Sequence, residues 1–192
     1  MSATRIPIFE LDGWNRQEDK LHRSDGSGHE VIGVRVEALG REIDFWDQLM
    51  IKPKRSGLVA LAVRELDGRL QALVRICSEP GIENYIEIGP TVQVSDSSRI
   101  SEKLQESLVH VLNLEPGKRI TEQFRYDSLQ SDEGGRFFRS EVRHVIVDCN
   151  IPPPSEDYRW CDVMTLISIA QPGNVLNIQI RDALACLLST TY

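Results

Sequence analysis

The order of apolar and polar residues along the chain predicts a set of β-strands. From Val31 to Ala38, apolar side chains recur at every second position, which is the period of a half-buried strand. Two further apolar runs, Leu58–Glu65 and Leu70–Cys77, lie on either side of Asp67-Gly68. An Asp-Gly pair between apolar runs is typical of a tight hairpin, so we expect these two runs to pair antiparallel.

Shorter segments add further strands and one loop. Tyr85–Ile88 and Thr91–Val94 are predicted to be short strands, and Pro90 between them indicates an edge or a bulge. Arg143–Cys149 alternates again and is predicted to be a strand. The polar, glycine-bearing segment Gln130–Arg139 is predicted to be a loop or tight turn.

Helical spacing appears in three segments. Ser97–Asn113 has apolar residues three and four apart, with Ser97 or Ser98 as its N-cap. Asp162–Ile169 and Val175–Leu188 have the same period. In the last helix the predicted buried face consists of Ile178, Leu184, Ala185 and Leu188.

These elements predict an α+β fold with a central, antiparallel-rich sheet and C-terminal helices. Residues 1–28 are mostly polar, with a short apolar segment from Ile6 to Leu11, and are expected to form an N-terminal arm. Residues 29–192 are expected to form a single module, because a chain of 192 residues has the length of one domain.

Composition narrows the classes of function. The chain has 22 Lys and Arg against 29 Asp and Glu, and the resulting net charge of −7 disfavours nucleic-acid binding. No apolar run approaches the ~20 residues of a membrane-spanning helix, and the first residues contain no stretch of signal-peptide length. We therefore expect no membrane contact and a cytoplasmic location. The four cysteines form no CxxC pair and are expected to be buried, reduced thiols.

Common catalytic motifs are absent from the sequence. It has no glycine-rich phosphate loop and no GxSxG turn. The four histidines, His144 among them, are not spaced as metal ligands, so we expect no metal site and expect the histidines to be surface or capping residues.

Four segments nevertheless place amides or arginines beside apolar or aromatic residues. They are Ser78–Gly81 leading into Gly89–Gln93, then Phe124–Phe138, Tyr158–Trp160 and Asn177–Arg181. Polar groups need partners when they are buried. Either these segments bind a small polar ligand, or their side chains satisfy one another.

The same segments carry a resemblance that covers most of the chain. Its pieces, in order, are Arg5–Trp14, Arg41–Gln48, Glu79–Gly81, Pro90–Gln93, Leu129–Phe137, Arg159-Trp160, Asn177–Arg181 and Leu184–Leu187. In order and spacing they resemble the NDP-hexose 2,3-dehydratase family of deoxysugar biosynthesis.

The resemblance implies a Nudix-like α+β module, here without the Nudix box that holds metal in pyrophosphate hydrolases. It implies an NDP-4-keto-6-deoxyhexose substrate that loses its C2 hydroxyl without a cofactor. The 4-keto group acidifies the C3 proton, a base removes that proton, and the hydroxyl leaves with help from an acid.

The resemblance also suggests residues for these roles. Glu133 and Tyr158 are candidates for proton transfer. Arg136 is a candidate for the diphosphate or the enolate oxygen, with an ion pair to Asp132 or Glu133 as its alternative. Trp160 either stacks on the ligand or belongs to the core. The other candidate substrate-binding residues are Gln93, Gln130, Ser131, Arg159, Asn177 and Arg181.

Two departures from the family pattern leave several functions open. Family members are about twice as long and contain two modules, so a single module is expected to form a homodimer that imitates the tandem. Gln179 stands where the closing motif usually has an acid. The chain is thus either a half-length dehydratase or a non-catalytic module that binds a nucleotide sugar or a peptide. A third alternative is an assembly partner of a full-length dehydratase.

Overall fold

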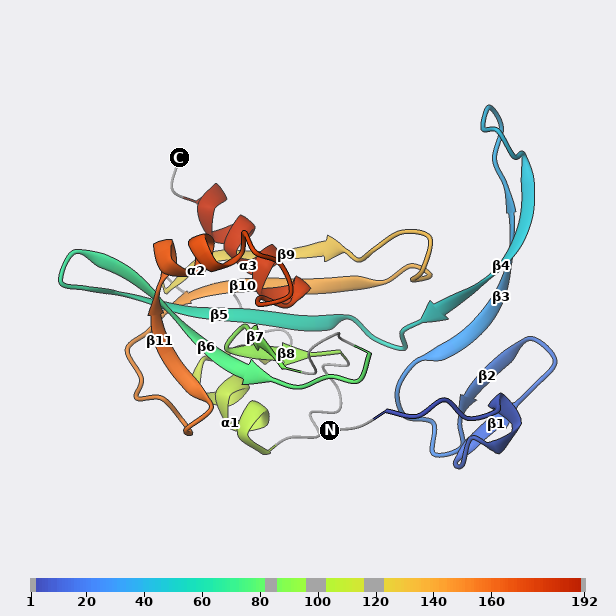
Figure 1. The fold of residues 1–192 in the computed structure, drawn as a ribbon, viewed down its shortest axis with the longest axis horizontal. Helices are drawn as coiled ribbons and strands as arrows, with labels where there is room; N and C mark the ends of the chain where they lie inside the picture. Colours follow the sequence, from blue (N-terminus) through green and yellow to red (C-terminus); the bar gives the residue numbers. More distant parts are fainter. Residues whose placement is uncertain (1–2, 82–85, 96–102, 116–122, 191–192) are drawn as a thin grey trace.

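The computed structural model describes residues 3–81, 86–95, 103–115 and 123–190, which form two sheets and three α-helices (Figure 1). The first part of the chain contains a 3₁₀ turn, η1, and four strands. These are η1 (Ile8–Glu10), β1 (Trp14–Arg16), β2 (Lys20–Arg23), β3 (Glu30–Glu37) and β4 (Phe45–Lys52). The four strands pair antiparallel in chain order.

The second sheet contains the remaining strands that the structure describes. They are β5 (Gly57–Leu66), β6 (Arg69–Cys77), β7 (Glu87–Gly89), β8 (Val92–Val94), β9 (Phe124–Ser131), β10 (Glu141–Asp148) and β11 (Tyr158–Asp162). The strand order is β11-β6-β5-β10-β9, with β7 on β6 and β8 on β5. The sheet is mixed because β10 runs parallel to β5 while the other strand pairs are antiparallel.

Helices cover both faces of the second sheet. They are α1 (Lys103–Val111), α2 (Val163–Ile169) and α3 (Ile178–Ser189). Alternate side chains of β5 enter the two cores: Leu58, Ala60 and Ala62 pack with α1, whereas Val59, Leu61 and Val63 pack with α2 and α3. The uninterrupted apolar run of β5 follows from burial on both faces.

The predicted α+β class, mixed sheet and C-terminal helices are confirmed. The hairpin between β5 and β6 also forms as predicted, with Asp67 and Gly68 both at positive φ, as a tight hairpin turn requires. Within the described residues, no helix is both long and apolar enough to cross a bilayer.

Several predicted boundaries change. Gln130 and Ser131, predicted to lie in a loop, belong to β9, and the turn starts after them. The helix predicted from Val175 begins at Ile178, because the Asn177 side chain caps it by accepting from the Ile180 N–H. The predicted N-caps Ser97 and Ser98 lie outside the described residues.

The predicted buried face of α3 is largely wrong. Only Leu184 of the four predicted residues is buried, and Ile178, Ala185 and Leu188 are exposed. The buried face instead consists of Ile180, Ala183, Leu184 and Leu187. Apolar residues also occur on the exposed side of the helix, beside Gln179, Arg181 and Asp182, and the prediction chose that side.

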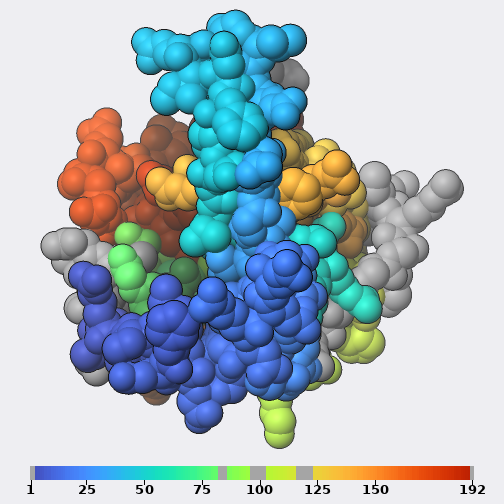
Figure 2. Space-filling view, turned by 90° about the vertical axis from the view of Figure 1, so that its right-hand side faces the viewer, coloured from blue at the N-terminus to red at the C-terminus, as the bar shows by residue number. Residues whose placement is uncertain are grey.

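The paired strands β3 and β4 extend as a ribbon beyond the end of the second sheet (Figures 1 and 2). At its base, Ile51 forms a bridge with Phe137 of the β9–β10 turn, and the Gln48 side chain donates to the Gly135 carbonyl. The division into an arm of residues 1–28 and a module of residues 29–192 stays a prediction, and β2 pairs with β3 across that boundary.

Candidate functional site

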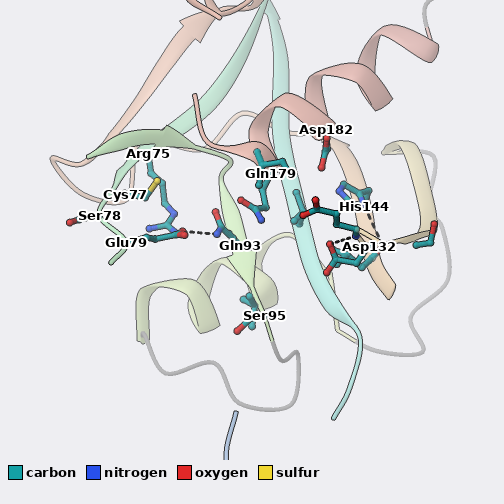
Figure 3. Close-up of a pocket in the computed structure, with 16 residues that line it drawn as sticks. Arg75, Cys77, Ser78, Glu79, Gln93, Ser95, Asp132, His144, Gln179 and Asp182 are labelled. Atoms are coloured by element: carbon teal, nitrogen blue, oxygen red, sulfur yellow. Dashed lines mark hydrogen bonds between the residues drawn. The ribbon is translucent and has the colours of Figure 1, made fainter. Parts of the chain in front are cut away.

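A cavity of about 540 Å³ opens where β5 and β6 separate (Figure 3). The two strands pair with each other only from Ala62 and Leu73 toward their hairpin. Beyond that point, β8 pairs with β5 and β7 pairs with β6. The wall of the cavity is completed by the first residues of α3 and the start of the β9–β10 turn.

Gln93 of β8 lies at the centre of a hydrogen-bonded series of side chains. Its Nε2 donates to Glu79 Oε1 at 2.7 Å, and its Oε1 accepts from Asn177 Nδ2 at 2.8 Å. Asn177 is buried and does not line the cavity directly. The amide of Asn177, predicted to bind substrate, is therefore used inside the protein, whereas Gln93 and Glu79 face the cavity.

Arg75 brings a positive charge into the cavity wall from β6. Its Nε is buried, and no described residue accepts a hydrogen bond from that atom. A buried donor without an acceptor costs folding free energy of the order of 1–3 kcal/mol. A guanidinium in this state is suited to a ligand that brings phosphate or carbonyl oxygens.

His144 and Asp182 stand at the other end of the cavity, on β10 and α3 (Figure 3). The His144 Nδ1 lies 3.3 Å from the Val142 carbonyl, which only accepts, so Nδ1 carries the hydrogen there and Nε2 is the nitrogen left to exchange a proton. Burial raises the pKa of the Asp182 carboxyl, and the neighbouring His144 and Arg181 partly oppose that rise.

Two predicted site residues, Ser131 and Glu133, line this same end of the cavity. Gln179 lines it as well, so the position where the family pattern has an acid does face the cavity. Asp182 follows on α3 three residues later, on the same side of the helix, and brings a carboxylate into the same wall.

A second cavity of about 430 Å³ lies between α3 and β9. Gln130, another predicted substrate-binding residue, lines this second cavity, and its amide donates to the Tyr126 hydroxyl. Ser131, His144 and Asp182 line both cavities and thus form the wall between them.

Tyr158 and Trp160, both predicted site residues, belong to the core of the second sheet. Tyr158 is 2% exposed, and its hydroxyl accepts from Gln105 and donates to the Thr91 carbonyl. The Trp160 indole donates to the Ile151 carbonyl and lies under the Arg64 guanidinium, 4.2 Å from the ring centre. Neither residue lines the cavity, which supports the core alternative for Trp160.

The three predicted arginines also lie outside the cavity lining. Arg136 forms the ion pair given above as its alternative, with Glu133 at 3.4 Å. Arg159 donates to the Tyr158 carbonyl, and Arg181 lies 3.4 Å from the Asn177 carbonyl.

Sequence reasoning missed Arg75, Glu79, His144 and Asp182. Glu79 lay within a segment that the sequence marked as unusual, but no role was predicted for it. His144, expected at the surface or as a cap, is 6% exposed and faces the cavity. The chain as described has no cluster of His, Cys, Asp and Glu that would hold a metal ion.

All four cysteines are free thiols, but the prediction that they are buried is right only for Cys77. Cys77 is buried at the cavity wall, and the other three are half-buried. Burial raises the pKa of the Cys77 thiol, which donates to the Glu87 carbonyl at 3.2 Å. Cys77 is thus a protonated wall residue at neutral pH.

Comparison with known proteins shows what the chain resembles. The family model for NDP-hexose 2,3-dehydratase matches residues 1–187. A dTDP-4-dehydro-6-deoxy-alpha-D-glucopyranose 2,3-dehydratase of Saccharopolyspora spinosa is 36% identical over 98% of this chain and 39% of its own length. A protein of the same name from Streptomyces violaceoruber is 33% identical over 96% of this chain and 42% of its own length. The chain spans about two fifths of these relatives.

Similar solved structures are more distant. A Caenorhabditis elegans Ap4A hydrolase has a TM-score of 0.39 and 15% identity, and covers 74% of this chain with 99% of its own. An ADP compounds hydrolase has a TM-score of 0.47 and 13% identity, and covers 98% of this chain with 95% of its own.

Proposed function

The chain belongs to the NDP-hexose 2,3-dehydratase family, and on that premise we propose that its cavity binds dTDP-4-dehydro-6-deoxy-D-glucopyranose and removes the C2 hydroxyl as water. One observation carries the proposal: the cavity combines an arginine whose Nε has no acceptor among the described residues with proton-transfer groups at both ends. Arg75 and Glu79 stand at one end, and His144 and Asp182 stand at the other.

The reaction needs two proton transfers. A base takes the C3 proton, which is acidic because C3 lies next to the C4 carbonyl, and the electron pair of the C–H bond moves onto the C4 oxygen. When this enolate collapses, a C2–C3 double bond forms and the C2–O bond breaks. An acid protonates the departing hydroxyl, so that water leaves. After this elimination, the enol at C3 becomes a ketone as its hydroxyl proton is lost and C2 takes up a proton. No redox cofactor takes part in these steps.

The charges of the cavity suggest how the substrate lies. Four carboxylates line the cavity, those of Glu79, Asp132, Glu133 and Asp182, against the single guanidinium of Arg75. A diphosphate is repelled by carboxylates, whereas a neutral sugar accepts hydrogen bonds from their protonated forms and donates its hydroxyls to their ionised forms. We therefore place the diphosphate at Arg75 and the sugar ring between Glu79 on one side and His144 and Asp182 on the other.

A non-catalytic binding module is the second candidate, and the same acidic lining favours it. A cavity with this charge suits the basic side chain of a peptide. The end strands of the second sheet, β9 and β11, would accept an extended peptide by strand addition. Gln179 in place of an acid also fits a module that has lost the chemistry.

The β3–β4 ribbon supports the proposal of a homodimer. Its tip and its outer face expose large apolar side chains, with Leu39 at 100% and Leu49 at 73% exposure. A two-stranded ribbon is marginally stable in water on its own. We propose that a second copy of this chain covers these exposed side chains. A full-length dehydratase as partner is the alternative, and the cytoplasmic location stays a prediction.

Thermal unfolding with nucleotides and an elimination assay test the proposed function. A ligand at about 100 times its Kd adds about 2.7 kcal/mol to the free energy of unfolding, which raises the Tm by several degrees for a chain of this size. We expect this rise with dTDP, and loss of water from the dTDP-4-keto sugar. A Tm that rises with a lysine-rich peptide, and not with any nucleoside diphosphate, would instead establish the binding module.

A further inference from the structure

A series of three hydrogen bonds joins the N-terminus of α3 to a carboxylate in the cavity. The Ile180 N–H donates to Asn177 Oδ1 at 3.0 Å, and Asn177 Nδ2 donates to Gln93 Oε1 at 2.8 Å. Gln93 Nε2 then donates to Glu79 Oε1 at 2.7 Å, the contact drawn as a dashed line in Figure 3. We call this series the amide relay.

The relay has one possible direction. A backbone N–H only donates, so the oxygen of Asn177 must face Ile180 and its NH₂ group must face Gln93. Gln93 then meets Asn177 with its own oxygen, and its NH₂ group is left to face Glu79. The orientation of both amides is thus determined by the chemistry at the first bond.

The surroundings hold the relay in place. Asn177 is 4% exposed, and Gly89 leaves the space that it occupies, because a Cβ at Gly89 would lie 3.2 Å from Asn177 Nδ2. The backbone N–H of Gln93 is held separately by the Gln105 side chain, which belongs to α1. The Gln93 amide that donates to Glu79 is therefore positioned by α1 through Gln105 and by the start of α3 through Asn177.

We propose that Glu79 is the base that takes the C3 proton, and that Gln93 and Asn177 are the positioning residues that aim its carboxylate. This inference rests on the proposed dehydratase function. The Gln93 amide donates to Oε1 of Glu79, and Oε2 of Glu79 has no partner among the described residues. One defined oxygen of Glu79 is therefore left for the substrate. Because the relay presents an N–H to Glu79, the carboxylate is held as an acceptor.

The substitution Asn177→Asp tests the relay without removing the helix cap. An aspartate keeps the oxygen that accepts from the Ile180 N–H, but it has no N–H for Gln93. Gln93 then turns its amide to donate to the new carboxylate, and it presents its oxygen to Glu79. Two oxygen acceptors repel, so Glu79 loses its fixed position while the helix start is preserved.

We expect Asn177→Asp to lower kcat and the rate of deuterium uptake at C3 from heavy water about 10–100-fold, with KM changed less than about twofold, because misplacing a base slows chemistry more than binding. Glu79→Gln is expected to abolish C3 exchange while dTDP still raises the Tm. Asp162→Asn is the matched control, because Asp162 caps α2 in the same way and does not line the cavity.

A spectroscopic measurement tests the relay in the free protein. The side-chain NH₂ signals of Gln93, assigned by their absence in Gln93→Met, are expected to move in Asn177→Asp and to stay in place in Asp162→Asn. Signals that do not move would overturn the relay, whatever the activity.

Different results would overturn the positioning role of Asn177 and the dehydratase function. If the Asn177→Asp variant takes up deuterium at C3 as fast as the wild type while its Gln93 NH₂ signals are displaced, the positioning role is overturned. The dehydratase function then still stands. A wild-type protein that binds dTDP, but neither exchanges the C3 proton nor releases water, would overturn the dehydratase function. The role of Glu79 as base would fall with it. The NH₂ signals of Gln93 would still test the hydrogen-bonded relay itself.

Discussion

Thr91 donates its hydroxyl to the backbone carbonyl of Leu73 at the point where β5 and β6 separate. The same oxygen accepts the Ala62 N–H at 2.9 Å, and Thr91 is fully buried. Ala62 and Leu73 are the last residues of β5 and β6 that pair with each other. One side chain thus bridges the N–H and the carbonyl of this last pair, and the space beyond it holds β7, β8 and the cavity.

Thr91→Val is therefore expected to destabilise the protein. Valine has nearly the same shape but leaves a buried N–H and a buried C=O without partners, each at about 1–3 kcal/mol. For a chain of this size each kcal/mol lowers the Tm by about 2–4 °C. Thermal unfolding by circular dichroism measures the change. Thr91→Ser keeps the hydroxyl and serves as control, and a valine variant more stable than the serine variant would contradict this account.

The fold was predictable where burial alone sets the pattern. Gly57–Leu66 and Arg69–Cys77 formed as expected because each has apolar residues and a defined turn between them. β9 was missed because pairs of charges stabilise it: Arg143 on β10 holds Asp127 with two hydrogen bonds of 2.8 and 2.7 Å. Hydropathy counts such residues as polar and cannot show that they pair.

The site was less predictable than the fold. Of the residues that the resemblance suggested, Gln93, Ser131 and Glu133 line the cavity, and Asn177 lies directly behind it. It could not show that Tyr158 is used inside the core, or that Arg75 faces the cavity. Arg75 lies on a strand whose side chains alternate between the faces, and only the separation of β5 from β6 opens the cavity beside it.

Arg75→Met is expected to weaken the binding of dTDP without destabilising the protein. In the free protein the buried Nε has no acceptor among the described residues, so its removal costs no hydrogen bond. Hydrogen bonds to charged groups contribute about 1.5–3 kcal/mol, which corresponds to about 10–150-fold in Kd. Isothermal titration with dTDP measures the loss.

Arg64→Met is the matched control for Arg75→Met. Arg64 donates to Gln71 and Asn150 and lies over the Trp160 ring, and it does not line the cavity. Its removal is expected to lower the Tm and leave dTDP binding intact. If both variants bound dTDP like the wild type, the diphosphate would not lie at Arg75.

Asp182→Asn is expected to stabilise the protein at neutral pH and to stop the elimination. Burial raises the pKa of this carboxyl above its ordinary value of 3.8, so folding disfavours the ionised form. The penalty is absent below the unfolded-state pKa and develops as the pH rises through the folded-state pKa. The Tm of the variant should exceed the wild-type Tm at pH 7, and the difference should shrink as the pH falls toward 3.8.

A double variant tests whether Asp182 supplies the carboxylate that the family pattern has at the position of Gln179. Gln179→Glu combined with Asp182→Asn returns the acid to the position of the family pattern, in the same cavity wall. We expect the double variant to regain part of the elimination rate that Asp182→Asn loses, because the two side chains lie on one side of the helix. No recovery, together with full activity in Asp182→Asn alone, would exclude Asp182 from proton transfer.

Leu49→Glu is expected to separate the proposed homodimer into single chains. Phe45, Asp47 and Leu49 alternate along β4, and all three side chains are more than half exposed, so they form the outer face of the β3–β4 ribbon. A glutamate on this face remains in water in a monomer and costs nothing, whereas it is buried without a partner when a second copy covers the ribbon. Light scattering coupled to gel filtration measures the mass against the 21.8 kDa of one chain.

Met164→Glu separates a specific interface from a general effect of added charge. Met164 is 69% exposed and lies on α2, away from the ribbon, so this variant is expected to keep the mass of two chains. If the Leu49→Glu variant stays folded by circular dichroism but has half the wild-type mass, the ribbon is the interface. A wild-type protein with the mass of one chain at high micromolar concentration would contradict the homodimer. Binding to a full-length dehydratase would then be measured with the same two variants, because the exposed apolar side chains of the ribbon still indicate an interaction surface.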